Sequence, residues 1–403
     1  MIKFSVVIPT YNNKVLLNNT LEALNDQLDF ESNTYEVIVV DDGSSDDTLQ
    51  YIQETPRTYI FHYIYLERTP DSCRARVRNT GWKRAQGQFV VFLDADMIVK
   101  RNYLRELQLY FEVNKELLVI SYRFMLKEPI ALEDVRSGQI FEKNYRTLDY
   151  FEARHFDSLV HSFNIATLKH PWHCVFSCNM ALPRAVLEQL DGFDENYKGW
   201  GMEDTDIGYR CYLLGMRIVS HLGIEALHQY HGEAFGDVKN QEKMIEWDQN
   251  IARMYRKFPS LHKELPRWRI NLAYFTRRVP QILMRPARYM KTYHFTVKSE
   301  EELPLLKEKI EELSSRPGNL VIVWDELESA AFHLWIQLLG YTRSEVRYYP
   351  KSFLFERKEI KQFLGNVFTW KKLLVLSFRC IRLLSSRLTR RFSRRLTLQS
   401  ARK

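Results

Sequence analysis

The sequence predicts an α/β protein with a mostly parallel sheet in its first 240 residues, followed by a smaller α/β segment and a basic amphipathic helix. Three observations support this prediction. Short apolar runs alternate with segments of helical spacing over the first hundred residues, which is typical of a parallel sheet with right-handed crossovers. A second, shorter alternation begins near residue 290. Residues 366–403 combine many arginines with evenly spaced Leu, Ile and Phe.

Four short apolar runs near the N-terminus are typical of buried strands. They are Phe4–Ile8, Tyr35–Val40, Ile60–Leu66 and Phe89–Leu93. The segments between them have the apolar spacing of helices and comprise Val15–Leu28, a short helix that carries Leu49 and Ile52, and Arg74–Ala85. We expect Asp47 or a neighbour to cap the second of these helices.

Acidic side chains follow two of these strands. Asp42 lies just after the second strand, and Asp94 and Asp96 lie just after the fourth. Open α/β sheets bind ligands at the carboxyl ends of their strands. Two carboxylates this close repel each other and need a positive partner, which a divalent cation that holds a diphosphate would supply. A solvated acidic turn is the alternative. The chain has neither a dinucleotide fingerprint nor a P-loop motif.

Composition sets limits on location and charge. No apolar run is long enough to predict a membrane-spanning helix, and we expect no signal peptide. The five cysteines form no Cys-x-x-Cys pair, which favours a reducing cytosol, and we expect Cys174 and Cys178 to be buried thiols.

Of the 58 Lys and Arg residues, 11 lie in residues 371–403, which contain no acid; the other residues carry 47 basic and 50 acidic side chains. The net charge of +8 therefore comes from the C-terminal segment.

Four motifs occur in order near the N-terminus: V-V-I-P-T-Y-N (6–12), V-I-V-V-D-D-G-S-S-D (37–46), R-A-R-V-R-N-T-G (74–81) and F-L-D-A-D (92–96). Three more follow: F-S-C-N-M-A-L-P-R (176–184), L-D-G-F-D-E (190–195) and G-W-G-M-E-D-T-D (199–206). The first four resemble family 2, GT-A-fold glycosyltransferases. The last segment resembles the acceptor half of β-1,4-galactosyltransferases and bacterial chondroitin-type polymerases. The resemblance spans about residues 3–235 and implies a GT-A catalytic domain, which is Rossmann-like with a mostly parallel sheet.

The resemblance implies a binding site for a UDP-sugar donor. Pro9, Thr10 and Tyr11 match the positions around the uracil ring. Asp42 matches the acid that accepts a hydrogen bond from the uracil N–H group, and Arg74 matches an arginine that contacts the nucleotide.

The resemblance also implies a site for Mn²⁺ or Mg²⁺. Asp94 and Asp96 match the motif that ties ribose and diphosphate to the metal, with Asp96 as the more direct ligand. A third ligand is expected near residue 230. His228 is preferred because the chondroitin-type enzymes carry a His-Gln step here, and His231 is the alternative.

Inverting transfer requires a base that takes a proton from the acceptor hydroxyl as it attacks the anomeric carbon. Asp204 matches this base, and Glu203 matches an acidic neighbour that helps to hold sugar or acceptor hydroxyls. An acidic first turn of a helix, favoured by the helix dipole, is the alternative for these acids and applies best to Asp206.

The wall beside the donor and acceptor sugars is matched by Trp200, Gly201 and Met202. Met202 replaces the usual glycine, and His173 is a further candidate for the acceptor site.

We expect four parts: a catalytic domain (1–240), a helical connector (241–289), a small α/β accessory domain (290–365) and a basic amphipathic helix (366–403). In the accessory domain we expect strands at Tyr293–Val297 and Leu320–Trp324, and helices at Ser299–Leu313 and Glu326–Leu339. Its role is open between a scaffold, a dimer contact and a module that recognises the acceptor.

The C-terminal segment has apolar residues at three- or four-residue steps, with arginines between them. The apolar residues are Leu374, Phe378, Ile381, Leu384, Leu388, Phe392 and Leu396. Such a helix is typical of a protein that lies on an anionic membrane surface. A packing or partner helix is the second interpretation; nucleic-acid binding is the third, and no motif supports it.

The sequence therefore predicts a cytoplasmic glycosyltransferase, peripheral on the inner membrane face. It would be metal-dependent and inverting, and would move a sugar from a UDP-sugar to a glycan or lipid-linked acceptor in cell-surface polysaccharide synthesis. Nucleotidyl transfer is one alternative, but it leaves 199–204 without a role. An inactive glycan-binding or membrane scaffold is another, although it predicts loss of the metal ligands.

Overall fold

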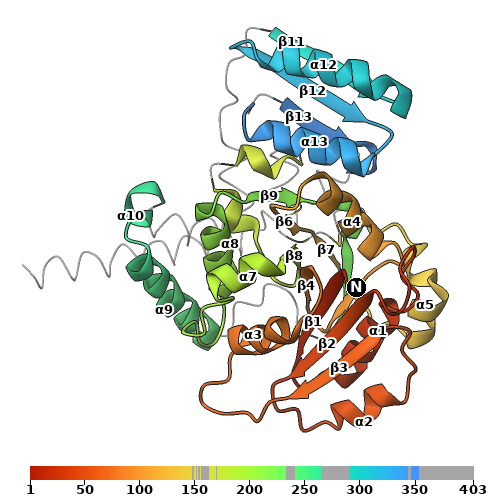
Figure 1. Cartoon of the computed structure of the whole chain (residues 1–403), viewed down its shortest axis with the longest axis vertical. Helices are drawn as coiled ribbons and strands as arrows, with labels where there is room; N and C mark the ends of the chain where they lie inside the picture. Colours follow the sequence, from red (N-terminus) through yellow and green to blue (C-terminus); the bar gives the residue numbers. More distant parts are fainter. Residues whose placement is uncertain are drawn as a thin grey trace, which may run out of the picture. The chain divides into compact units, whose positions relative to one another are not determined.

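The computed structural model describes residues 1–147, 149–150, 152, 155, 163–168, 170–232, 241–265, 291–343 and 346–353. Residues 1–146 and 150–354 form one unit, whose helices and strands are labelled in Figure 1. The basic helix expected at 366–403 lies outside the described residues, as do residues 266–289 of the expected connector. Within the described residues, no helix combines the length and apolarity needed to cross a bilayer.

A seven-stranded sheet with the order β3-β2-β1-β4-β8-β6-β9 forms the centre of residues 1–265 (Figure 1). Its strands are β1 (Phe4–Thr10), β2 (Tyr35–Asp41), β3 (Ile60–Tyr65), β4 (Phe89–Leu93), β6 (Leu117–Ile120), β8 (Asn179–Pro183) and β9 (Arg217–Ser220). Neighbouring strands are parallel except at β8, which is antiparallel to both β4 and β6. The predicted α/β architecture with a mostly parallel sheet is confirmed.

Helices cover both faces of this sheet. Figure 1 shows α3, α7 and α8 on one face and α1 and α4 on the other. The helices of this part are α1 (Lys14–Ala23), α2 (Thr48–Gln53), α3 (Arg74–Arg84), α4 (Tyr103–Val113), α5 (Leu132–Ser137), α7 (Arg184–Leu190), α8 (Glu203–Leu213), α9 (Gln241–Lys257) and α10 (Leu261–Glu264). Every residue of β2 and β4 is buried, because helices pack on both sides of these strands. Gly81 lets α3 approach β1, since a Cβ there would lie 2.2 Å from Val7 Cγ1.

A small second sheet, ordered β5-β10-β7, lies beside the carboxyl end of β4. Its strands are β5 (Met97–Ile98), β7 (Arg123–Met125) and β10 (Ala226–His228). The central strand β10 is antiparallel to β5 and parallel to β7. Short 3₁₀ helices occur at η1 (Gln139–Phe141), η2 (Ile165–Thr167), η3 (Pro171–Cys174) and η4 (Leu222–Ile224).

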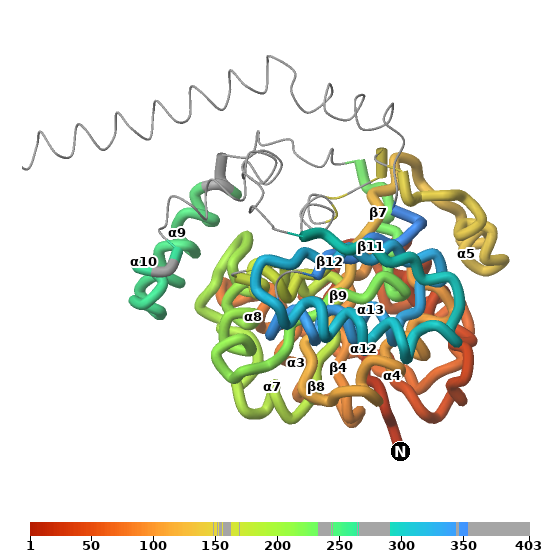
Figure 2. Tube along the Cα trace, turned by 90° about the horizontal axis from the view of Figure 1, so that it is seen from above, coloured from red at the N-terminus to blue at the C-terminus, as the bar shows by residue number. Residues whose placement is uncertain are grey.

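Residues 291–353 form a three-stranded parallel sheet with two helices. Its elements are β11 (Lys291–Val297), η5 (Glu300–Glu302), α12 (Leu303–Ser314), β12 (Asn319–Asp325), α13 (Ala330–Gly340), β13 (Val346–Pro350) and η6 (Lys351–Phe353). Figures 1 and 2 show α12 and α13 on the same face of this sheet, as two right-handed crossovers require. The two strands expected in this segment are present.

Helix α13 covers the edge of the seven-stranded sheet at β9. The Gln337 carboxamide accepts from the N–H of Ser220 at 2.7 Å and donates to its carbonyl oxygen at 2.7 Å. The Tyr341 hydroxyl accepts from the N–H of Ile218 at 2.5 Å and donates to its carbonyl oxygen at 2.8 Å. Two side chains thus satisfy four backbone groups of an edge strand.

Several predicted helix boundaries and caps differ in the structure. Helix α12 begins at Leu303 instead of Ser299, because residues 300–302 form the 3₁₀ helix η5. Helix α1 ends at Ala23, five residues before the predicted end, because the Gln27 carboxamide bonds the Ala23 carbonyl oxygen in a turn. Asp47 precedes α2 in a left-handed backbone conformation and makes no capping hydrogen bond. Helix α13 begins at Ala330 rather than Glu326, since the Asp325 carboxylate accepts the N–H groups of residues 327 and 328 in a turn.

Candidate active site

Two short strands assemble a cluster of possible metal ligands. Asp96 directly precedes β5, and β10 ends at His228, which lies opposite Met97 in the antiparallel pair. The N–H of Gln229 donates to the Asp96 carbonyl oxygen at 2.9 Å. Asp96 Oδ2 lies 3.2 Å from His228 Nε2, and ligand atoms of Asp96, His228 and His231 all lie within 4.8 Å of one another. We refer to these three residues as the Asp96 cluster.

The Asp96 cluster fits a divalent cation. Asp96 Oδ1 is buried and has no hydrogen-bond partner, so one carboxylate oxygen is available to a ligand. Burial alone would raise the pKa of Asp96, but the hydrogen bond and charge of His228 outweigh burial and lower the pKa below its ordinary value. An ionised carboxylate with two imidazoles is a donor set for divalent metals.

A buried arginine organises the neighbouring acids. Arg78 projects from the inner face of α3 and its side chain is 4% exposed. Its Nη2 lies 3.1 Å from Asp94 Oδ1, and its Nη1 lies 3.4 Å from Glu203 Oε1. The charge of Asp204 also acts on the guanidinium. We refer to Arg78, Asp94, Glu203 and Asp204 as the Arg78 cluster. It joins the end of β4 to the first turn of α8.

The pKa values in the Arg78 cluster follow from burial and crowding. Burial, followed by the charge of Asp204, raises the pKa of Glu203 above its ordinary value, although Arg78 opposes this shift. Burial would lower the pKa of the Arg78 guanidinium, but the carboxylates around it raise that pKa. Arg78 therefore stays charged, and it compensates acids that would otherwise repel one another.

Arg78 is not among the site residues that the motifs predict. The nucleotide contact is predicted at Arg74. Arg74 is exposed, and its Nη1 donates to the carbonyl oxygen of Gly199 at 3.2 Å. A helical signal for Arg78 exists, because Ala75, Arg78 and Trp82 recur at three- and four-residue steps and are all buried. An arginine on the apolar face of a helix indicates a buried acidic partner.

The acids at the start of α8 have different surroundings. Asp204 Oδ1 accepts a hydrogen bond from the Ser177 hydroxyl, and Asp204 is half-buried at the Arg78 cluster. Asp206 is fully buried and lies 2.6 Å from Arg210 Nε and 2.8 Å from Lys257 Nζ. Asp206 lies in the first turn of α8, as its structural interpretation predicts, and it also links α8 to α9, which the sequence did not indicate.

Helix α9 holds the loop that carries Trp200. The Asn250 carboxamide donates to the carbonyl oxygens of Lys198, Trp200 and Gly201, and a carboxylate oxygen of Glu246 accepts the N–H of Trp200 at 2.9 Å. A Cβ on Gly201 would lie 2.4 Å from the Trp247 ring, so only glycine fits there. The sequence did not indicate this contact between residues almost fifty positions apart.

Met202, which replaces the glycine usual in the resembling enzymes, is buried directly before α8. Its φ angle is 79°, a left-handed conformation that glycine adopts at least cost. Met202 therefore occupies a backbone conformation that glycine adopts more readily.

The expected nucleotide residues lie at the ends of β1 and β2. Thr10 pairs with Asp41 in the parallel register, and the N–H of Asp42 donates to the Thr10 carbonyl oxygen. Thr10 Oγ1 and Asp42 Oδ1 are buried without hydrogen-bond partners. Asp42 Oδ2 lies 2.6 Å from Arg68 Nη1, and the Arg68 guanidinium lies 4.0 Å from the centre of the exposed Tyr11 ring. Arg68 is a further residue of this region that the motifs did not indicate.

His173 lies in η3, which packs against α8. Its ring is half-buried, 4.2 Å from the ring of Trp172. Cys174 and Cys178 are buried, as expected. An acceptor role for His173 stays a prediction.

Two protein families match this chain. Residues 5–190 match "Glycosyl transferase family 2", and residues 157–232 match "N-terminal domain of galactosyltransferase". These matches cover the segments that contribute the Asp96 and Arg78 clusters. The resemblance inferred from the motifs is confirmed.

Named relatives agree with these families. Validoxylamine A glucosyltransferase of Streptomyces hygroscopicus subsp. limoneus is 28% identical over 272 residues, which are 65% of this chain and 58% of the relative. Chondroitin synthase of Pasteurella multocida is 27% identical over 66% of this chain and 28% of the relative. A poly(ribitol-phosphate) beta-N-acetylglucosaminyltransferase of Staphylococcus aureus is 34% identical over 124 residues, which are 30% of this chain and 21% of the relative. The chain thus spans less than two thirds of the length of these relatives.

Proposed function

We propose that this protein, whose residues 5–190 belong to glycosyltransferase family 2, transfers a sugar with inversion from a UDP-sugar to a glycan or lipid-linked acceptor. The observation that carries the proposal is the Asp96 cluster beside the Arg78 cluster, at the carboxyl ends of the parallel strands. This is the edge at which open α/β sheets bind nucleotides.

The buried polar atoms near β1 and β2 support a uridine donor. Asp42 Oδ1 would accept the uracil N–H, and Thr10 Oγ1 would bond a second polar atom of the base or ribose, because both atoms are buried without partners. Tyr11 and Pro9 would line the ring, and Arg74 would contact the nucleotide. Two relatives support a polymeric acceptor in cell-surface polysaccharide synthesis. One is named a poly(ribitol-phosphate) beta-N-acetylglucosaminyltransferase, and the other a chondroitin synthase.

Asp94, Asp96 and His228, with His231 as the alternative to His228, would hold the cation. Bound Mn²⁺ or Mg²⁺ would supply positive charge that compensates the departing diphosphate. The lowered pKa of Asp96 keeps its carboxylate ionised for this role. Arg78 holds the Asp94 carboxylate in place through a direct contact at 3.1 Å.

Asp204 would act as the general base. Its carboxylate would take the proton of the acceptor hydroxyl as that oxygen attacks the anomeric carbon, while the Ser177 hydroxyl holds the carboxylate in position. Glu203 would hold a sugar or acceptor hydroxyl. Trp200, on the loop fixed by α9, would form a wall for the sugars together with Gly201 and Met202.

We further propose that the basic residues of 371–403 hold the protein on an anionic membrane surface at the cytoplasmic face. The support is the sequence pattern of this segment, in which 11 basic residues and no acid accompany an apolar stripe.

Titration calorimetry of UDP tests the catalytic proposal. The wild-type protein and Asp96→Ala are titrated with UDP in Mn²⁺ and again in EDTA. We expect wild type to bind more tightly in Mn²⁺ by at least tenfold, and Asp96→Ala to lose this difference, since removal of a metal ligand removes the binding linked to the metal. Equal binding by wild type in Mn²⁺ and EDTA would contradict the proposal.

A further inference from the structure

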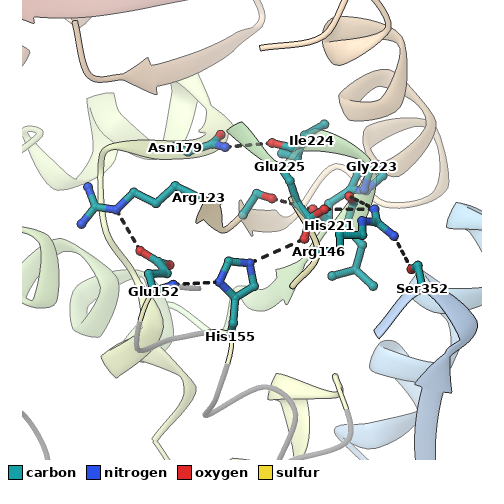
Figure 3. A network of polar contacts seen from close by, with 12 residues as sticks. Arg123, Arg146, Glu152, His155, Asn179, His221, Gly223, Ile224, Glu225 and Ser352 are labelled. Atoms are coloured by element: carbon teal, nitrogen blue, oxygen red, sulfur yellow. Dashed lines mark hydrogen bonds and ion pairs between the residues drawn. The ribbon is translucent and has the colours of Figure 1, made fainter. Parts of the chain in front are cut away.

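Arg146 contacts the three-stranded sheet of residues 291–353, here called the C-terminal sheet, and the segment that leads into β10 (Figure 3). Its Nη2 is 3.0 Å from Glu225 Oε2 and also donates to the carbonyl oxygen of Leu222. Its Nη1 is 3.4 Å from Glu328 Oε2 and bonds the Ser352 hydroxyl. One guanidinium therefore links η4 and β10 to the residues that follow β12 and β13.

Glu225 directly precedes the strand that ends at His228 of the Asp96 cluster. It is buried, and β10 begins at the next residue and ends at the metal-ligand candidate His228. The rise of an extended strand is about 3.3 Å per residue, so Glu225 and His228 lie roughly 10 Å apart on one short, hydrogen-bonded segment. Because metal–ligand distances tolerate only about 0.2 Å, a small shift of this strand would change the affinity for the metal.

A second set of contacts holds Glu225 and β7, which pairs with β10. His155 Nε2 lies 3.7 Å from Glu225 Oε1, and His155 Nδ1 accepts the N–H of Glu152 at 3.2 Å. The Glu152 carboxylate is 2.8 Å from Arg123 Nε on β7. The charges of Asp96 and Asp94 act favourably on Arg123. The network in Figure 3 thus runs from the C-terminal sheet to the surroundings of the metal site.

From these contacts, we propose that Arg146 is a positioning residue through which residues 291–353 fix β10, and with it His228, in the geometry that binds the metal. The proposal rests on the proposed function, because it assigns to the C-terminal sheet a role in donor binding linked to the metal. Partners around a metal ligand typically contribute 10- to 100-fold in affinity, and Arg146 acts one contact further out.

The test is UDP titration of Arg146→Met, Arg146→Lys and a control variant, each in Mn²⁺ and in EDTA. Arg136→Met is the control, because Arg136 also pairs with a glutamate, Glu22 at 3.1 Å, but this pair joins α5 to α1 and does not involve the segment between η4 and β10. We expect Arg146→Met to weaken UDP binding about fivefold in Mn²⁺ and to leave binding in EDTA unchanged. Arg146→Lys is expected to restore part of the affinity, and Arg136→Met to behave as wild type.

Wild-type affinity of Arg146→Met in Mn²⁺, or an equal loss in Mn²⁺ and EDTA, would overturn the inference and leave the proposed function standing. Lack of metal-dependent binding by wild type would instead overturn the proposed function and this inference with it. If Arg146→Met does not fold, the Glu328→Gln, Ser352→Ala double variant replaces it. That variant weakens the hold of the C-terminal sheet on Arg146, and unchanged metal-dependent binding in it would also overturn the inference.

Discussion

The Arg78 and Asp96 clusters lie at the end of the same strand, and their acids are compensated in opposite ways. Asp94 and Glu203 contact Arg78, a permanent cation whose side chain is 4% exposed. Asp96 contacts His228, a side chain whose charge depends on protonation, and keeps one buried oxygen without a partner.

The difference shows how two carboxylates one residue apart can serve different purposes. An arginine inside the protein fixes the position of one acid, and breaking such a buried pair is costly. The other acid keeps coordination capacity that a cation can use. The two clusters should therefore respond differently to mutation. Changes at Arg78, Glu203 and Asp204 should affect folding and catalysis, and changes in the Asp96 cluster should affect metal-linked binding. Asp94 pairs with Arg78 and is also a proposed metal ligand, so changes there should affect both.

Asp204→Asn tests the catalytic side of the Arg78 cluster and should have the largest effect. The amide cannot accept the proton of the acceptor hydroxyl, so we expect sugar transfer to fall about 10³-fold or more. The affinity for UDP in Mn²⁺ should remain within about twofold of wild type, since the amide keeps the size of the side chain. An equal loss of UDP binding and of transfer would exclude Asp204 as the base.

Arg78→Met tests the structural side of the same cluster. Glu203 and Asp94 would lose their buried cation, and the free energy of unfolding should fall by about 3–5 kcal/mol. His228→Gln removes no permanent charge and should cost about 1 kcal/mol or less. Denaturant unfolding of both variants measures the contrast; similar losses would mean that the two clusters are not different in kind.

The variants His228→Gln and His231→Gln test which histidine of the Asp96 cluster binds the metal. Both rings lie within reach of Asp96, but His228 is buried on β10 whereas His231 is exposed beyond it. We expect His228→Gln to reduce the Mn²⁺-dependent part of UDP affinity by about 10-fold or more, and His231→Gln to reduce it less. The reverse order, measured by calorimetry, would assign the ligand to His231.

Glu203→Gln should give the smallest effect, an increase in stability at neutral pH. The folded-state pKa of Glu203 is raised, so the folded protein binds more protons than the unfolded chain once the pH exceeds about 4.5, and stability falls as pH rises through the folded pKa. A neutral amide removes this cost. Thermal unfolding should show a melting temperature about 2 °C higher at pH 7.5 and no gain near pH 4. A variant less stable than wild type at pH 7.5 would contradict this assignment.

Much of the fold could be predicted because buried parallel strands have a simple sequence pattern. Phe89–Leu93 is apolar at every position, and all five residues are buried in β4. The helix ends were less accurate: a side-chain contact from Gln27 ends α1, and a turn at Asp325 delays α13. Such contacts depend on which segments meet in three dimensions, which local spacing does not contain.

The candidate site shows the same limit. Asp94, Asp96 and Asp204 could be selected because they belong to motifs that are compact in sequence. Arg78 lies in such a motif, and its spacing from Ala75 and Trp82 favours burial. Its acidic partners, however, follow only from the position of α3 against β4 and α8. The hydrogen bond from Asn250 to the carbonyl oxygen of Trp200 joins segments far apart in the chain, so no local pattern could indicate it.

The side chains of Gln337 and Tyr341 cover the edge strand β9, and a shortened chain would lose this cover. Gln337 and Tyr341 occupy the backbone groups of Ile218 and Ser220 that face outward from the last strand of the sheet. A chain truncated before residue 330 would expose these groups as a template for strand addition by a second molecule. We therefore expect α13 and Tyr341 to protect the seven-stranded sheet against aggregation, and expression of residues 1–265 alone to require another cover for this edge.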